Sequence, residues 1–349
     1  MDIEIEKVVG NYPSIILSSI WSESFPDLDS KKRIVWAYQE NVYGEAQMWL
    51  LKNKTTGEYF GCTASLPRCF FINGKKIKGT LLADTAVKKK YRTLGPVLKL
   101  HKEIIRSSQD SGLLIAFPNK VAEASIKMVG FKKAENLINY IKIIKSITIL
   151  EEKIKNPIIF KLLFPFLPIV NFGLKLLDFR TGSSKKFTCS HIKTFDKRFD
   201  EIWEKFSRRY NFVFERSSNY LNWRYGESYD KDYNIYVVLD RDSQNLLGYI
   251  IYYIKNDWVY VDDFLWLEES LKLKNLLSFF IRMIRNKNVK LVRFIIIDNS
   301  LIQKIFRKMR FIRMNPTYPI LYFSLDESLN QIFPHTVKKA FITSGDKDF

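Results

Sequence analysis

The second half of this 349-residue chain repeats the order of predicted elements of the first half, and this duplication constrains the fold most. Asn119 and Asn299 mark equivalent points 180 residues apart, each just after a predicted strand. An acidic residue, Asp84 or Asp263, stands 35 or 36 residues before each asparagine, and a phenylalanine follows each one 12 residues later. Two related domains explain this spacing better than chance.

Each half alternates strands and helices in the order of a mixed α/β domain. The first half predicts strands at 46–53, 59–72, 78–87 and 112–118, with helices at 94–109 and 121–128. The second half predicts strands at 234–242, 246–254, 258–267 and 289–298, with a helix at 269–287. We therefore expect tandem domains at 1–145 and 196–349, joined by a linker at 146–195 that contains inter-domain helices.

Residues 156–177 are strongly apolar but are not predicted to cross a membrane. Lys161, Lys175 and three prolines interrupt them, and the longest uncharged run, 162–174, is shorter than the ~20 residues that a span needs. A buried linker or inter-domain helix is expected, and a helix lying on a membrane surface is the alternative. The acidic N-terminus does not resemble an export signal, so the expected location is the cytoplasm.

The charge is strongly basic, with 56 Lys and Arg against 37 Asp and Glu, a net +19. Such a field would attract CoA, a nucleotide-linked sugar, tRNA or an anionic membrane, although solubility alone would also explain it. Cys62, Cys69 and Cys189 lack CxxC spacing and a nearby histidine cluster, so neither a disulfide framework nor a metal site is expected.

The most informative motif is the turn at 91–97, which joins a predicted strand to a helix. Such a turn presents backbone N–H groups at the positive end of a helix, where a pyrophosphate can bind. The motif residues are Arg92, Thr93, Leu94, Gly95 and Val97 in the turn, Val87 before it, and Asn119, Ala122, Gly130 and Phe131 after it.

This arrangement resembles the Gcn5-related N-acetyltransferase (GNAT) superfamily, with its Arg/Gln-x-x-Gly-x-Gly/Ala turn and later Asn-x-x-Ala…Gly-Phe block. The resemblance is good over about 1–140 and weak over 200–325, where Arg310 replaces the glycine and no pyrophosphate turn remains. It implies tandem GNAT-like domains, the second degenerate, and one acyl-CoA site. Acetyl-CoA or a short hydroxyacyl-CoA would be the co-substrate, held by Val87, Arg92, Thr93, Leu94, Gly95, Val97, Asn119 and Ala122.

Two positions depart from the family pattern. Val97 stands where the family has Gly or Ala, and the preceding Pro96 removes one N–H donor. Ile126 stands where many members place a tyrosine that protonates the departing CoA thiolate. Water or a backbone donor would have to serve instead.

Three carboxylates are candidates for the general base that the attacking amine needs. Asp84, near the end of the strand before the turn, is the first candidate, and Asp263 with its neighbour Asp262 is the second. The alternative for each is a strand-end carboxylate that accepts backbone hydrogen bonds.

A second motif, at 215–225, resembles the Asn-Trp-Arg-Tyr segment of double-GNAT proteins associated with surface polysaccharide synthesis. Arg216 and Arg224 are candidates to hold phosphates or a carboxylate. Trp223 or Tyr225 would stack on a base or sugar beside Asn222. The same residues would equally serve to join the two domains.

Together these features predict an acyl-CoA-dependent N-acyltransferase acting on the amine of a nucleotide-linked amino sugar, by direct attack in a ternary complex. Nucleic acid is not an expected partner, whereas contact with a membrane through 156–177 is compatible. One alternative is a Fem-type peptidyltransferase that uses aminoacyl-tRNA. Another is a GNAT module that binds CoA without turnover.

Overall fold

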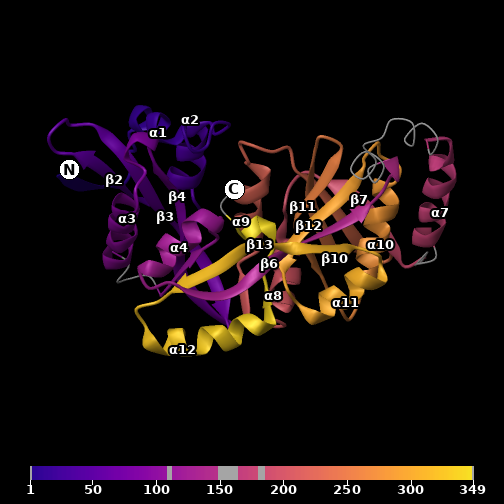
Figure 1. Cartoon of the computed structure of the whole chain (residues 1–349). Helices are drawn as coiled ribbons and strands as arrows, with labels where there is room; N and C mark the ends of the chain where they lie inside the picture. The colour runs from indigo at the N-terminus through magenta and orange to yellow at the C-terminus, as the bar shows by residue number, and fades with distance from the viewer. Residues whose placement is uncertain (1, 108–111, 148–163, 180–184, 348–349) are drawn as a thin grey trace.

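A single mixed β-sheet runs through the whole molecule in the computed structural model of the chain (Figure 1). The structure describes residues 2–107, 112–147, 164–179 and 185–347. Within these residues the sheet has 14 strands, ordered β1-β2-β3-β4-β5-β13-β6-β12-β11-β10-β9-β7, with β8 and β14 branching from β3. The predicted mixed α/β class is confirmed.

The first half follows the predicted order, with additional short helices before β2. Its elements are β1 (Ile3–Val8), α1 (Ser14–Trp21), α2 (Ser30–Arg33), the π-helical turn η1 (Ile34–Gln39), β2 (Gln47–Asn53), β3 (Tyr59–Ile72), β4 (Lys75–Val87), η2 (Lys89–Tyr91), α3 (Leu94–Ser107), β5 (Leu113–Ala116), α4 (Lys120–Met128) and β6 (Lys132–Ile143).

The second half repeats this order and adds a C-terminal extension. Between the halves lie η3 (Phe164–Phe166) and α7 (Leu167–Phe179). The second half comprises β7 (Phe187–Ile192), α8 (Lys197–Ser207), β8 (Phe212–Phe214), α9 (Ser218–Leu221), the π-helical turn η4 (Asn222–Gly226), β9 (Asn234–Asp240), β10 (Leu246–Lys255), β11 (Trp258–Trp266), α10 (Leu273–Ile284), β12 (Leu291–Ile297), α11 (Ser300–Lys308) and β13 (Ile312–Phe323). The extension is α12 (Glu327–Thr336), η5 (Val337–Lys339), β14 (Ala340–Phe341) and η6 (Ser344–Asp346).

Local turn chemistry explains several of these boundaries. Asn73 and Gly74 both have positive φ, 49° and 77°, as a two-residue hairpin turn between β3 and β4 requires. Pro96 lies in the first turn of α3, where its missing N–H costs nothing, and Gly130 ends the α4 segment with φ 106°. Each of these boundaries follows from a local signal in the sequence.

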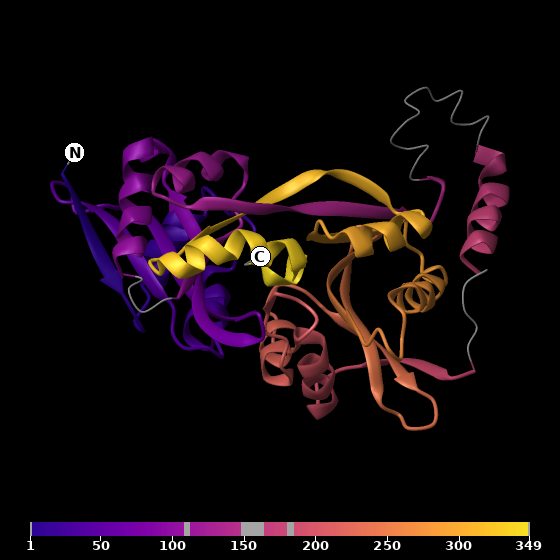
Figure 2. The same cartoon turned by 90° about the horizontal axis from the view of Figure 1, so that it is seen from below.

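The two halves exchange their last strands. β6 follows α4 of the first half but pairs with β12 of the second, from Leu137–Ile297 to Ile143–Leu291. β13 follows α11 of the second half but pairs with β5 of the first and with β6. Figure 2 shows these two long strands running side by side from one half to the other.

The hydrophobic core is shared because of this exchange. One cluster contains buried side chains from both halves. Phe333 of α12 contacts Phe212 of β8, and β8 pairs with β3 of the first half. The domain limits at 145 and 196 stay a prediction. Hydrogen bonding across β6 and β12 ties the parts on either side of residue 145 into one sheet.

Two tryptophans meet in a reciprocal contact where the halves join. Trp36 of η1 and Trp223 of η4 each donate an indole N–H to the other's backbone carbonyl, both at 2.9 Å. Their rings stack with centroids 4.9 Å apart and planes 11° apart. The guanidinium of Arg224 lies 5.1 Å from the Trp36 ring, and that of Arg68 lies 5.1 Å from the Trp223 ring.

We expect Trp223→Phe to destabilise the whole chain, because it removes one donor and leaves the carbonyl of Trp36 buried without this partner. The expected loss is about 1–3 kcal/mol, measured from urea unfolding followed by circular dichroism. Trp258→Phe, at a half-buried position, is the control and should cost less. Equal losses in the two variants would contradict a special role for the pair.

Candidate functional site

The sheet opens in the first half where β4 and β5 part. Their parallel pairing runs from Gly79–Leu113 to Leu82–Ala116 and stops there, although β4 continues to Val87. The pairing of β4 with β3 shifts register between Cys62 and Ala64, opposite Asp84, whose φ is 48°. A bulge of this kind bends a strand, and here it turns β4 away from β5. We call this gap the first opening.

The turn predicted from the sequence lies at one end of the first opening. Arg92 donates from Nε to the carbonyl of Val87 at 3.2 Å and from a terminal nitrogen to Ser24 Oγ at 3.1 Å. Thr93, Leu94 and Gly95 are exposed, and α3 begins at Leu94. The first N–H groups of a helix have no partner within it, so this end of α3 can bind an anion.

Asn119 and Ala122 lie at the start of the next helix. Asn119 caps α4 and accepts hydrogen bonds from the backbone N–H groups of Val121 at 3.0 Å and Ala122 at 2.9 Å. Val97 and Ala122 are partly buried and both pack against the same hydrophobic cluster. Ile126 is a buried member of that cluster. Ile126 is therefore a core position rather than a place for a proton donor.

Asp84 is buried at the bulge and is held by two other side chains. Arg33 donates to it from Nε at 3.0 Å and from a terminal nitrogen at 3.3 Å, and the Tyr38 hydroxyl donates at 2.6 Å. Burial, with Asp84 as the second cause, raises the pKa of Tyr38 well above its usual value, so this tyrosine stays protonated. The bulge carboxylate is therefore fixed in orientation.

The second half opens in the same way, but there the C-terminal segment enters the gap. β11 and β12 pair from Trp258–Leu291 to Val261–Phe294 and then part. In this second opening Ile297 donates its N–H to the carbonyl of Ile342 at 2.9 Å, and Ser344 Oγ donates to the carbonyl of Val261 at 3.2 Å.

A buried charge network holds this C-terminal segment. Arg216, with a fully buried side chain, contacts Asp263 from Nε at 2.9 Å and Asp346 from a terminal nitrogen at 2.8 Å. Burial is the largest effect on the pKa of Asp263 and raises it, Arg216 opposes the rise, and Asp346 adds to it. One guanidinium therefore compensates two carboxylates away from water.

The other substrate residues predicted from the sequence lie next to this network. Arg224 donates to the backbone carbonyls of Gly345 at 3.1 Å and Lys347 at 2.9 Å. Asn222 exchanges two hydrogen bonds with the backbone of Phe195, and Trp223 and Tyr225 are buried. These residues build the wall behind the second opening, and their predicted role toward a substrate stays a prediction.

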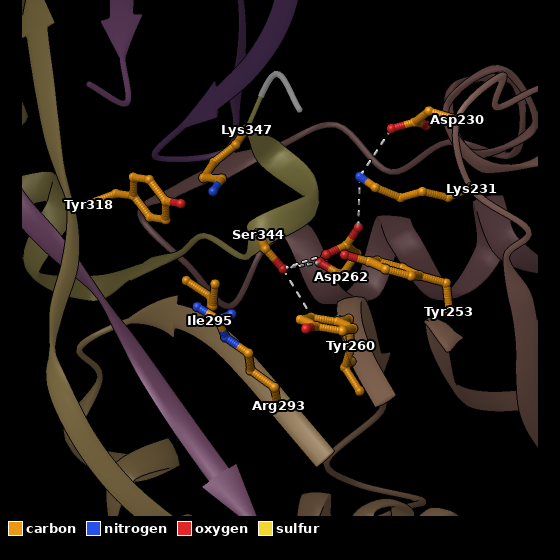
Figure 3. Close-up of a pocket in the computed structure, with 11 residues that line it drawn as sticks. Asp230, Lys231, Tyr253, Tyr260, Asp262, Arg293, Ile295, Tyr318, Ser344 and Lys347 are labelled. Atoms are coloured by element: carbon orange, nitrogen blue, oxygen red, sulfur yellow. Dashed lines mark hydrogen bonds and ion pairs between the residues drawn. The ribbon is translucent and has the colours of Figure 1, made fainter. Parts of the chain in front are cut away.

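A cavity of about 360 Å³ lies beside the C-terminal segment in the second opening (Figure 3). Its lining includes one predicted site residue, Asp262, which accepts hydrogen bonds from the Tyr233 hydroxyl at 2.7 Å and from Ser344 Oγ at 2.8 Å. The remaining lining residues are Asp230, Lys231, Tyr253, Tyr260, Val261, Arg293, Ile295, Tyr318, Ser344 and Lys347.

Sequence reasoning missed most of this cavity. Its basic residues, Lys231, Arg293 and Lys347, come from three separate parts of the chain. Alternation on β12 places Arg293 and Ile295 on one face, and Tyr260, Val261 and Asp262 are consecutive on β11. No local motif joins these two strands to the other lining residues.

The apolar segment at 156–177 falls partly outside the described residues, which resume at 164. Phe166 of η3 and Ile169 and Phe172 of α7 are exposed there. Among the described residues, no helix is long and apolar enough to cross a membrane.

Searches against known proteins found similarity in structure but not in sequence. No family model matches the chain, and no curated protein matches its sequence. A conserved protein of Enterococcus faecalis, named as a probable N-acyltransferase, superposes with a TM-score of 0.68 at 11% identity, covering 93% of this chain and 73% of that one.

Two further structures show the same likeness. A GCN5-related N-acetyltransferase from Anabaena variabilis has a TM-score of 0.62 at 14% identity, covering 93% of this chain and 74% of that one. The Saccharomyces cerevisiae N-myristoyltransferase with bound myristoyl-CoA has a TM-score of 0.59 at 11% identity, covering 92% and 82%. The predicted fold of tandem GNAT-like domains is thus confirmed.

We expect Arg216→Ala to cost about 3–5 kcal/mol of unfolding free energy, because it leaves Asp263 and Asp346 buried without their cation. The loss should be smaller at pH 5 than at pH 8. Burial raises the pKa of Asp263, so this carboxylate takes up a proton as the pH falls, and the variant regains stability as it does so. Urea unfolding at the two pH values measures both effects.

Arg313→Ala is the matched control for this arginine. Arg313 also pairs with an aspartate, Asp298 at 2.7 Å, but the side chains are 41% and 30% exposed. Such a surface pair contributes about 0–1 kcal/mol. Similar losses in both variants would show that the C-terminal segment does not depend on Arg216.

Proposed function

We propose that this chain is an acyl-CoA-dependent N-acyltransferase with one donor site, at the first opening. The observation that carries the proposal is the difference between the two openings. In the first, the parted strands lead to an exposed helix start with Arg92 and Gly95. In the second, residues Ile342 and Ser344 of the C-terminal segment bond to the parted strands.

The chemistry around the turn supports binding of a pyrophosphate. Lys89 and Lys90 are exposed beside the turn and add positive charge to that of the helix start. A Cβ built on Gly95 would meet no atom within 4 Å, so packing within the protein does not explain this glycine. Close approach of a ligand to the backbone does explain it. The bound group would be acetyl-CoA or a short hydroxyacyl-CoA.

Transfer would proceed by direct attack within a ternary complex. The amine loses a proton to a base, its nitrogen bonds to the thioester carbon, the C–S bond breaks, and the thiolate takes up a proton. Asp84 and Asp263 are each held by an arginine away from the cavity, whereas Asp262 pairs with Lys231 at 3.8 Å and lines the cavity. Among the three predicted candidates, Asp262 is thus the carboxylate best placed to meet an acceptor there.

We propose a nucleotide-linked amino sugar as the acceptor. The cavity of about 360 Å³ falls at the small end of the range typical for ligand pockets. Its tyrosines and basic side chains suit a polar, negatively charged molecule, and a role in surface polysaccharide synthesis would follow from such a substrate. The nucleotide would extend beyond the cavity.

We expect Gly95→Ala to weaken CoA binding at least tenfold while leaving the melting temperature unchanged or higher. The added methyl meets nothing in the protein, and alanine favours the helix over glycine by roughly 0.5–1 kcal/mol. The same methyl would obstruct a pyrophosphate on the backbone. Isothermal titration calorimetry measures the affinity and should give one CoA per wild-type chain.

Lys272→Ala is the matched control, because Lys272 precedes α10 at the corresponding place in the second half. It should bind CoA like the wild type. Two equivalent CoA sites, or an unaffected Gly95→Ala variant, would reject the donor site. CoA binding without thiol release for any amine would favour the silent module, and salt-sensitive tRNA binding without CoA binding would favour the peptidyltransferase.

We further propose that α7 contacts an anionic membrane surface. The segment η3–α7 exposes four large apolar side chains, Phe166, Ile169, Val170 and Phe172. Asn171 of α7 accepts a hydrogen bond from the backbone of Ser146, which places the helix beside Lys145 and Lys290. An apolar face next to basic residues suits such a surface.

Replacing Ile169 and Phe172 by serine should reduce sedimentation with vesicles of phosphatidylcholine and phosphatidylglycerol at least threefold. The two changes remove two of the four exposed apolar side chains. Ile332→Ser, at an exposed site on α12, is the control and should sediment like the wild type. Wild-type protein that stays in solution with these vesicles would reject this contact.

A further inference from the structure

The cavity in the second half contains more basic groups than its own carboxylates require. Its walls come from β10, β11, β12, β13, the loop before β9 and the C-terminal segment (Figure 3). Both carboxylates already have partners. Asp262 bonds to Tyr233 and Ser344, and Asp230 accepts from Ser228 Oγ at 2.8 Å and pairs with Lys231 at 3.5 Å.

Arg293 is the basic group that no carboxylate neutralises. Its Nε donates to the side-chain oxygen of Asn139 at 3.1 Å, and its guanidinium lies 5.7 Å from the centre of the Tyr260 ring. Among the described residues, no Asp or Glu forms an ion pair with it. A guanidinium keeps its charge at all physiological pH values and presents two parallel donors to a phosphate or carboxylate.

Two lysines lie in the same cavity, and Lys231 pairs with both of its carboxylates, Asp230 at 3.5 Å and Asp262 at 3.8 Å. Lys347 has its Nζ 3.5 Å from the centre of the Tyr318 ring. Burial, with the nearby Lys231 and Arg293 and against the opposing charge of Asp262, lowers the pKa of Lys347 to about 7. Basic groups crowded in this way repel one another, and a bound anion would relieve the repulsion.

The cavity also approaches the first half of the molecule. Tyr229, two residues before Lys231, packs against Trp36 with ring centroids 5.4 Å apart. After burial, Arg33 and Asp84 are among the groups that shift the pKa of Tyr229. The loop that carries Lys231 therefore contacts the first half through Tyr229.

We propose that this cavity binds a small acceptor through an anionic group, a phosphate or a carboxylate, held by Arg293 and flanked by Lys231. This rests on the proposed function in one respect only, namely that the ligand is the acceptor of the acyl group. The anion would accept two hydrogen bonds from the guanidinium. The tyrosine hydroxyls of the cavity would form hydrogen bonds with the neutral part of the ligand.

Three matched amino sugars test this by isothermal titration calorimetry at low salt: glucosamine 6-phosphate, muramic acid and unmodified glucosamine. We expect at least one anionic sugar to bind tenfold or more tightly than glucosamine. Arg293→Gln should remove this difference in affinity. The side-chain amide nitrogen of the glutamine takes the place of the arginine Nε, so it can still donate to Asn139 and keep the variant folded. The relative affinities for phosphate and carboxylate identify which anion the cavity prefers.

Arg241→Gln, at an exposed turn, is the matched control and should leave all three affinities unchanged. Circular dichroism and melting curves confirm that each variant is folded. Absence of binding by both anionic sugars, or equal binding by wild type and Arg293→Gln, would overturn the proposal.

Thiol release from acetyl-CoA distinguishes this proposal from the proposed function. If the anionic sugar binds through Arg293 but releases no thiol, acyl transfer to it is rejected and the anion site stands. If thiol is released equally by wild type and Arg293→Gln, the enzyme activity stands and the anion site is rejected.

Discussion

The exchange of β6 and β13 is the constraint on which the rest of the structure depends. β6 follows α4 of the first half but pairs with β12 of the second, and β13 follows α11 of the second half but pairs with β5 of the first. The sheet of each half therefore needs a strand from the other half. Hydrogen bonds along two long strands then fix the two halves relative to each other. The two openings occupy corresponding places in this common sheet. The two halves differ mainly because the C-terminal segment enters the second opening.

That asymmetry comes from the C-terminal segment. It leaves α12, adds β14 beside β8, and enters the gap between β11 and β12, where Arg216 and Arg224 hold it through charge and backbone contacts. Gly345 is required there, because a Cβ would lie 1.9 Å from the hydroxyl oxygen of Tyr225 and 2.8 Å from the carbonyl oxygen of Asp262. The segment thus converts a gap between strands into one wall of a smaller, basic cavity.

The two halves therefore share one arrangement of strands and helices but place different side chains at their openings. The first copy keeps the basic turn and an exposed helix start, while the second uses its equivalent bulge, with Asp262 and Asp263, to bind its own C-terminal segment. Buried ion pairs of this kind contribute little net stability, because desolvation offsets their attraction. Their loss, however, is costly, so they specify where the segment lies.

The sequence by itself determined the central strands and helices of each half, the internal repeat, the turn at Asn73 and Gly74, and the helix start after Arg92. These depend on periodicity and turn chemistry within a few residues. Only the tertiary structure decided the strand exchange, the burial of Arg216 and the cavity around Arg293. Arg216 meets Asp346 across 130 residues, and Ser344 meets Asp262 across 82, so no local pattern records either contact.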